Sequence, residues 1–260
     1  MNKRLHAHVP YLRLAEYMEQ IISKRINPEI FFSAEALDSL ICEKLAIQSD
    51  MLRAAGLSCT IHAPFLDLNP GALDSTIREA TRRRFQQLFQ AAAVLKPRVM
   101  VFHPGYDELR YGGSRMAWLK NSIDFWGEFI PMAREVGSVI AVENIFEKEP
   151  STLRGLLEAV DDPCFRHCFD VGHWHMFTTV TLEEWFAELG SYVAELHIHD
   201  NHGQNDDHLP PGEGRIDFRR LFALAARYAP DAVLTIENHT MERLDRALRK
   251  IGDFMPVQQS

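Results

Sequence analysis

Short runs rich in β-branched and apolar residues alternate along the chain with longer stretches in which apolar residues recur at helical spacing. This alternation is typical of parallel strands joined by crossover helices. Helices are predicted at residues 39–56, 75–95 and 114–137, and the last two are terminated by Pro97 and Gly137, which favour helix ends. The predicted strands are Arg4–Val9, Glu29–Phe32, Leu57–Ala63, Val99–His103, Val139–Glu143, Arg166–Asp170, Val193–His199 and Val233–Glu237.

The strand-helix unit repeats eight times in 260 residues, and no linker rich in serine or glycine interrupts it. An open doubly wound sheet shows the same alternation, but it carries a glycine-rich phosphate loop after its first strand, and this chain has none there. We therefore expect the α/β class, with a single (β/α)₈ TIM barrel domain over residues 1–260. The content of 46% hydrophobic and 25% charged residues fits a globular protein with a substantial core.

The formal net charge of -8 disfavours nonspecific attraction to nucleic acid. No segment approaches the roughly 18–20 consecutive apolar residues that span a bilayer, so we expect a cytoplasmic protein without a membrane partner. Cys42, Cys59, Cys164 and Cys168 form no CxxC pair, which predicts buried free thiols and no thiolate zinc site. The sequence makes no prediction about the oligomeric state.

Polar residues are predicted to face the inside of the barrel at the ends of its strands. Alternate residues of a strand point to the same side, and the last inward residue of four strands is ionisable. A ring of ionisable groups inside a barrel is costly unless a counter-charge accompanies it. The pairs expected to face inward together are Thr60 with His62, Val101 with His103, Ala141 with Glu143, and Thr235 with Glu237.

Histidines and carboxylates at these strand ends, or in the loops just after them, form a candidate metal site. The C-terminal ends of the strands are the active-site face of this kind of barrel. So many imidazoles among the carboxylates favour zinc first, then manganese or iron, over calcium or magnesium. The predicted metal ligands are His62 (TIHAPF), His103 (VFHPG), Glu143 (VENIF), Asp170 and His173 (FDVGH), His197 (ELHIHD), Asp206 and His208 (NDDHLPPGEG), and Glu237 (TIENH).

The motifs AHVP, HAPF, FHPG, VEN, DVGH, HIHD, DDHLPPGEG and IEN extend over nearly the whole chain. Together they resemble the endonuclease IV branch (AP endonuclease family 2) of the xylose isomerase-like TIM barrels, a superfamily that also contains sugar and sugar phosphate isomerases and epimerases. The DxH followed by GEG is the most specific motif. The resemblance implies up to three zinc ions on the nine predicted ligands.

Strand spacing alone leaves both His197 and His199 open as the ligand on the seventh strand. The resemblance selects His197. For the sugar isomerases of the superfamily, it implies instead one metal, with His173 near the substrate. The positions that correspond to this single metal are Glu143, Asp170, His197 and Glu237.

The loops after three of the predicted ligands depart from the DNA-repair pattern. They read PFLDLNPGALD, PGYDELRYGGS and WHMFTTVTLEE, and they lack a set of basic and intercalating residues that would grip and kink a duplex. DNA is therefore disfavoured, although still open, and a small phosphoester or sugar phosphate is the expected substrate.

Charge favours hydrolysis of a phosphoester over isomerisation. The positive charge of three divalent ions exceeds the negative charge of the four predicted carboxylate ligands, so the site at the open end of the barrel would be positive and would suit a phosphate. One ion among three carboxylates would leave this site negative. Because His62, His103, Asp206 and His208 have no role in the isomerase scheme, we expect metal-assisted phosphoester hydrolysis. The loop positions of Arg110, Arg115 and Arg215 make them candidates for clamping phosphate oxygens.

The alternative is a sugar or sugar phosphate isomerase or epimerase with one Mn²⁺ or similar ion. Glu143 and Glu237 are then the acid and base on either side of the substrate, and His173 completes the catalytic set. Glu149 would hold sugar hydroxyls, and His199 would face the substrate. A third hypothesis is a barrel that binds a ligand without catalysing a reaction, and a complete metal site disfavours it.

Overall fold

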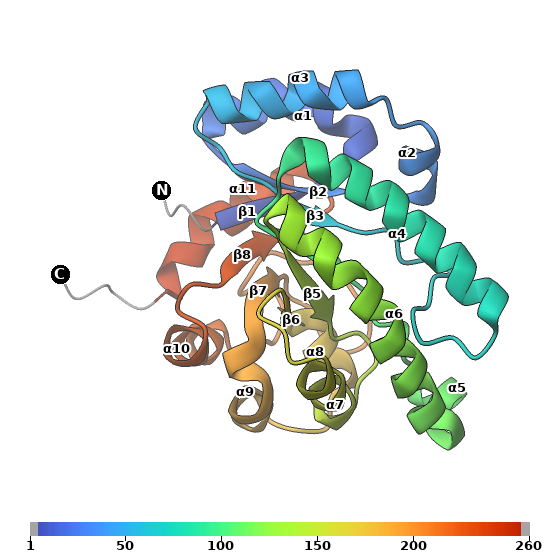
Figure 1. Cartoon of the computed structure of the whole chain (residues 1–260). Helices are drawn as coiled ribbons and strands as arrows, with labels where there is room; N and C mark the ends of the chain where they lie inside the picture. Colours follow the sequence, from blue (N-terminus) through green and yellow to red (C-terminus); the bar gives the residue numbers. More distant parts are fainter. Residues whose placement is uncertain (1–4, 256–260) are drawn as a thin grey trace.

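Eight parallel strands form a closed barrel in the computed structural model, which describes residues 5–255. Each strand pairs with its neighbours in chain order, and β8 pairs with β1 to close the sheet (Figure 1). The predicted TIM barrel is confirmed, while Arg4, the predicted start of the first strand, lies outside the described residues. The strands are β1 (Leu5–Pro10), β2 (Asn27–Phe31), β3 (Thr60–His62), β4 (Val99–Phe102), β5 (Val139–Glu143), β6 (Phe165–Asp170), β7 (Val193–Ile198) and β8 (Val233–Ile236).

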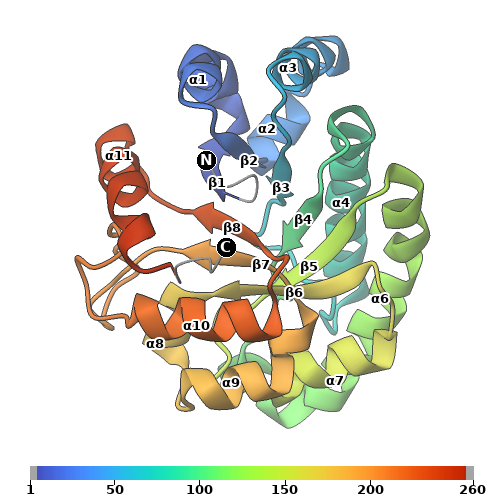
Figure 2. The same ribbon diagram turned by 90° about the vertical axis from the view of Figure 1, so that its left-hand side faces the viewer.

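The helices surround the barrel and cover its outer wall (Figure 2). The helix predicted at residues 75–95 has these bounds, because Asp74 caps its first turn through Thr76 N–H and Lys96 ends it in the left-handed region with φ 51°. The main helices are α1 (Tyr11–Lys24), α3 (Cys42–Ala54), α4 (Ser75–Leu95), α6 (Arg115–Val136), α7 (Ser151–Val160), α9 (Leu182–Leu189), α10 (Phe218–Tyr228) and α11 (Met241–Lys250), with short helices α2 (Ala34–Asp38), α5 (Glu108–Tyr111) and α8 (Val171–Phe177) between them.

Two apolar cores lie on the two sides of the barrel wall. The larger core lies between the strands and the helices and includes the buried Trp118, Trp126 and Trp185. Alternation along the strands places the smaller core inside the barrel, where it supports the polar strand ends from below. The smaller core consists of Val99, Val101, Ala141, Cys168 and Val233.

The strand register brings the polar residues to one end of the interior. Asp170 lies opposite His197 across the β6–β7 pair, and Glu143 ends β5. Thr60 and Thr235, which were predicted to face inward, both donate hydrogen bonds to Glu195 inside the barrel. The predicted inward direction of these side chains is therefore confirmed.

Two further expectations have structural outcomes. None of the helices within residues 5–255 combines the length and apolarity needed to traverse a bilayer. All four cysteines are free, and Cys59 and Cys168 are buried as predicted. Cys42 is exposed, so the prediction of burial was wrong there: this residue begins α3, at the surface of the molecule.

Candidate metal centre

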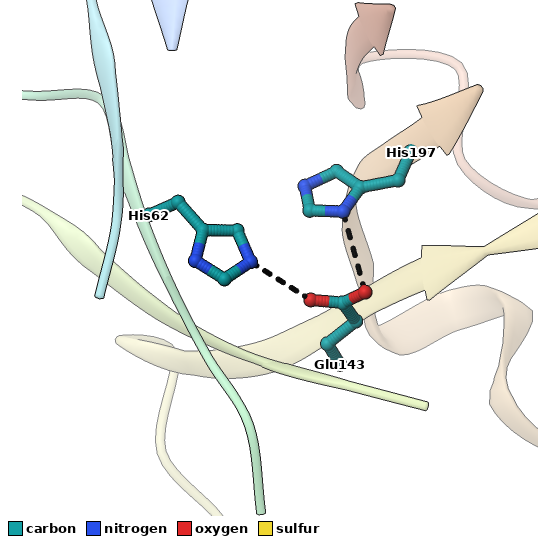
Figure 3. Close-up of side chains that lie close together, drawn as sticks. All are labelled: His62, Glu143 and His197. Atoms are coloured by element: carbon teal, nitrogen blue, oxygen red, sulfur yellow. Dashed lines mark hydrogen bonds and ion pairs between the residues drawn. The ribbon is translucent and has the colours of Figure 1, made fainter. Parts of the chain in front are cut away.

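The Glu143 carboxylate lies at the centre of a cluster of histidines at the C-terminal end of the barrel. Its Oε2 lies 3.2 Å from His62 Nε2 and 3.3 Å from His103 Nε2. Its Oε1 lies 3.2 Å from His173 Nδ1 and 3.4 Å from His197 Nδ1. Figure 3 shows His62 and His197 approaching the carboxylate from two sides of the barrel. One carboxylate thus joins side chains from strands that are far apart in the sequence.

The first group of predicted ligands is His62, His103 and Glu143. His62 Nδ1 lies 2.9 Å from the carbonyl oxygen of Ala63, and this contact turns Nε2 toward Glu143. The His103 ring stacks on Phe65 with centroids 4.2 Å apart, so its orientation is also held. Two imidazole nitrogens and one carboxylate oxygen, each held from outside, form the kind of ligand set that binds zinc.

The second group surrounds His197 Nδ1, a fully buried nitrogen without a hydrogen-bond partner. This nitrogen lies 3.4 Å from Glu143 Oε1, 3.4 Å from Glu237 Oε1 and 3.8 Å from Asp170 Oδ2. A proton on Nδ1 can point at only one of these oxygens, whereas a cation can contact all of them. The residues therefore fit a divalent metal ion.

The third group contains His173, Asp206 and His208. Asp206 Oδ2 lies 2.9 Å from His208 Nε2 and 3.6 Å from His173 Nε2. His208 adopts a left-handed backbone conformation with φ 47°, and its Nδ1 lies 3.0 Å from the carbonyl oxygen of Glu237. This contact anchors the loop after β7 to the end of β8. All nine predicted ligands thus gather in one continuous cluster.

Asp200 holds the loop that carries Asp206 and His208. Its buried carboxylate accepts hydrogen bonds from the backbone N–H groups of Gly212 at 2.9 Å, Gly214 at 2.8 Å and Ile216 at 3.2 Å. A Cβ on Gly214 would lie 2.3 Å from the Asn201 carbonyl oxygen, so only glycine fits there. The HIHD and GEG motifs therefore have a shared structural role in placing the third group.

His199, the other inward histidine of this chain segment, holds Asp170. Its Nε2 lies 3.1 and 3.0 Å from the two carboxylate oxygens of Asp170. Its side chain is 0% exposed and packs so closely on Gly172 that a Cβ there would lie 2.0 Å from the ring. The structure therefore places His199 beside a predicted ligand, without exposed surface for contact with a substrate.

The remaining residues predicted to bind substrate are Arg110, Arg115, Glu149 and Arg215, and their role stays a prediction. Arg110 is 78% exposed and pairs with Asp107, and the Arg115 guanidinium lies 3.4 Å from Ser151 Oγ. Glu149 accepts hydrogen bonds from Ser151 at the start of α7. Within residues 5–255, neither these three side chains nor that of Arg215 has a hydrogen bond or ion pair with the nine ligands.

Sequence reasoning missed three acidic or basic groups at the cluster. Glu29 Oε2 lies 3.1 Å from His197 Nε2, and His8 Nδ1 lies 3.2 Å from Glu29 Oε1 and 3.5 Å from Glu237 Oε1. Glu147, in the loop after β5, is buried with an unpartnered Oε1, and burial raises its pKa to about 7. Alternation would have identified Glu29, because it pairs with Thr60, an inward residue of the next strand.

Protons and cations compete for this cluster. Burial raises the pKa of the Glu143 carboxyl, but His197 and His103 outweigh it and hold the pKa well below its ordinary value. Burial lowers the pKa of His62, but the hydrogen bond with Glu143 outweighs it and raises the pKa to about 9. For His208, burial is likewise outweighed by Asp206, and its pKa rises to about 9. A metal must displace such protons in order to bind.

Several known proteins are similar to this chain in sequence or in structure. The chain is 24% identical to a probable endonuclease 4 of Mycobacterium leprae over 189 residues, which cover 69% of this chain and 73% of that protein. A D-tagatose 3-epimerase-like protein superposes with a TM-score of 0.82 at 23% identity and covers 96% of both chains. A Thermus thermophilus protein soaked with ZnCl₂ superposes with a TM-score of 0.81 at 22% identity, covering 96% of this chain and 97% of its own.

The two structural similarities establish the fold. A family model described as xylose isomerase-like TIM barrel matches residues 37–255, which contain all of the strand-end motifs except AHVP. The closed barrel, the cluster at its C-terminal end and this match agree with one another. The chain belongs to the xylose isomerase-like TIM barrel family.

Proposed function

We propose that this protein is a metal-dependent isomerase or epimerase of a sugar or sugar phosphate. The observation that carries the proposal is the placement of Glu143 and Glu237, whose Oε1 atoms each lie 3.4 Å from His197 Nδ1. Two carboxylates thus flank one ligand position. The similarity to epimerase-like structures also supports this reaction over the hydrolysis that the sequence alone favoured.

A divalent ion bound at this position polarises a substrate carbonyl and makes the neighbouring C–H bond more acidic. The neighbouring histidines hold the pKa of Glu143 low and keep it ionised, so its carboxylate has a free lone pair that can accept that proton. Glu237, 7% exposed, would deliver a proton taken from solvent to the other face of the carbon, and Glu143 would release its proton to solvent. His173 Nδ1, 3.2 Å from Glu143 Oε1, keeps that carboxylate oriented toward the substrate.

The side chains around the mouth also suit a sugar. Phe65 stacks on His103, and Phe31 lies with its ring centroid 5.6 Å from that of His62, so aromatic side chains line one side of the cluster. Ligand pockets commonly combine such apolar walls with a few polar groups that set orientation. Because no arginine or lysine within residues 5–255 forms an ion pair with the nine ligands, a phosphate on the substrate would rely on metal charge.

Phosphoester hydrolysis is the second candidate, and one specific observation favours it. We call the position between Glu143, Asp170, His197 and Glu237 the central position. The first group adds His62 and His103 to the cluster, and the third group adds Asp206 and His208. A single-metal isomerase leaves them without a ligand role. If these groups and the central position together held three divalent ions, the ions would supply the positive charge that a phosphate transition state requires.

Two measurements on one protein sample test these candidates. The purified chain is reconstituted with Zn²⁺ or Mn²⁺, its bound metal is counted by elemental analysis, and a panel of ketoses and ketose phosphates is followed by NMR in D₂O. We expect solvent deuterium to enter at the carbon beside the carbonyl, and Glu237→Gln to abolish this exchange. About three metals per chain with release of phosphate and without exchange would instead establish hydrolysis.

His103→Ala separates the candidates further. Under the isomerase proposal, deuterium exchange persists because the central position keeps its ligands. Under hydrolysis, phosphate release is lost because the first group is broken. A chain that retains no metal after reconstitution contradicts both candidates.

A further inference from the structure

Glu29 is a carboxylate buried beneath the predicted metal position, and its own position suggests no contact with a substrate. It lies on β2 and is 0% exposed. Oε2 lies 3.1 Å from His197 Nε2, and Oε1 lies 3.2 Å from His8 Nδ1. A buried carboxylate is costly unless hydrogen bonds compensate it, so its two imidazole partners account for its presence.

The contact between Glu29 and His197 determines which ring nitrogen faces the cluster. A carboxylate accepts hydrogen bonds, so Nε2 carries the proton. Nδ1 is then directed at the oxygens of Glu143 and Glu237, each 3.4 Å away. The other tautomer would direct an N–H toward those oxygens, and a flipped ring would direct a C–H; either leaves no nitrogen lone pair there for a cation.

Both oxygens of Glu29 are needed, because both of its partners are imidazole donors. A glutamine at this position is uncharged and offers one acceptor oxygen and one donor NH₂ group, so it can accept a proton from only one of the two rings, and the other ring must change its tautomer or lose the contact. Glu195, a second buried carboxylate inside the barrel, provides a contrast. It accepts hydrogen bonds from the hydroxyls of Thr60 and Thr235, and within residues 5–255 no hydrogen bond or ion pair joins it to an imidazole.

We propose that Glu29 is a positioning residue that fixes the orientation of the His197 ring, so that Nδ1 is presented to a divalent cation between Glu143, Asp170 and Glu237. This inference rests on the metal centre of the proposed function. Through its other oxygen, Glu29 also holds His8 at the edge of the same centre. Metal ligands of the histidine type commonly donate their second N–H to a carboxylate, and loss of that carboxylate weakens metal affinity by about 10–100-fold.

The test compares Glu29→Gln with Glu195→Gln, which removes a buried carboxyl from the same region without touching an imidazole. Zinc affinity is measured by competition with a chromophoric chelator. We expect Glu29→Gln to weaken binding by about 10–100-fold. Glu195→Gln is expected to bind zinc as the unaltered chain does.

A second measurement reports the protonation and the hydrogen bonding of the His197 ring. In ¹⁵N-histidine spectra of the zinc-loaded chain, we expect His197 to show a protonated Nε2 whose proton is hydrogen-bonded and slow to exchange with water. Glu29→Gln should remove this protection, whereas a purely structural role of Glu29 would alter thermal stability and leave the His197 signal unchanged. Should Glu29→Gln fail to fold, Glu29→Asp keeps both oxygens on a shorter side chain, and we expect intermediate values in both measurements.

Two results overturn different statements. If the unaltered chain takes up no zinc, the proposed function is wrong. If the unaltered chain binds zinc and the Glu29 variants bind it equally well with an unchanged His197 signal, only the role of Glu29 is wrong.

Discussion

Two regions of the barrel interior are equally buried but chemically opposite: the smaller apolar core, in the lower half, and the ligand cluster, in the upper half. Val101 and Ala141 in the lower half are 0% exposed, and so are Asp170 and His197 in the upper half. Burial of apolar groups stabilises the fold by itself. Buried ionisable groups stabilise it only to the extent that they neutralise one another or a bound ion. The ligand cluster in the upper half is therefore suited to binding an ion, and the apolar core in the lower half stabilises the fold.

The boundary between the halves is one step of two residues along a strand. On β5 the interior side chain changes from Ala141 to Glu143, and in the segment of β4 from Val101 to His103. On β3, β7 and β8 the corresponding residues are already polar, because Thr60 and Thr235 donate hydrogen bonds to Glu195 there. A substitution on one side of the boundary should therefore act differently from one on the other side.

The largest expected effect comes from Glu143→Gln, which removes the charge shared by four imidazoles. We expect loss of metal from the reconstituted chain and a fall in activity of more than about 100-fold, the upper range for residues that only support ligands. Elemental analysis and the deuterium exchange assay measure the two effects. Retention of metal and exchange at normal levels would show that the upper half does not depend on this carboxylate.

Val101→Thr is the matched change in the lower half. It keeps the volume of the side chain but buries a hydroxyl in an apolar core, at a cost of about 1–3 kcal/mol. We expect lower stability in urea with unchanged metal content. Metal loss in this variant would mean that the two halves do not act independently.

A smaller effect is expected from Gly214→Ala, which affects only the third group. The new Cβ would meet the Asn201 carbonyl oxygen and Asp200 Oδ1, each at 2.3 Å, so the loop must shift at a cost of about 1–3 kcal/mol. We expect weaker binding at His173, Asp206 and His208 with the central position intact. Titration with Co²⁺ should show the change, and Gly113→Ala, where the added Cβ meets open space, serves as the control.

The smallest expected effect is a dependence of stability on pH in the metal-free chain. His62 has a folded-state pKa of about 9, above the ordinary value of 6.5, so the folded chain binds more protons between these pH values. Its contribution is complete below pH 6.5 and is lost as the pH rises through 9. We expect the free energy of unfolding in urea to fall as the pH rises through this window. Stability that rises with pH there would contradict the buried His62–Glu143 pair.

Much of the fold and of the candidate site could be predicted from sequence periodicity. The helix at residues 75–95 was predicted with its observed bounds, because its apolar pattern and the following Pro97 are local signals. The nine ligands were predicted as a group, because strand ends in a closed parallel barrel converge. Their roles as ligands and catalytic residues stay predictions that the metal and exchange measurements address.

Contacts between distant segments required the structure. Strand spacing placed His197 and His199 on the same face but did not separate them, whereas the fold directs one toward Glu143 and Glu237 and the other onto Asp170. The loop arginines looked able to reach the mouth, yet Arg110 turns to Asp107 and Arg115 lies beside Ser151. Side chains in loops follow local partners that a repeat pattern does not encode.

The sequence by itself determined the barrel, the height of its polar layer and the residue types available to a metal, because period and register follow from local backbone geometry. Only the tertiary structure decided how these groups pair, and it brought in Glu29, which lies 168 positions from His197 in the chain. The physical reason is that buried charges are satisfied by whichever partners the closed barrel brings within hydrogen-bonding distance.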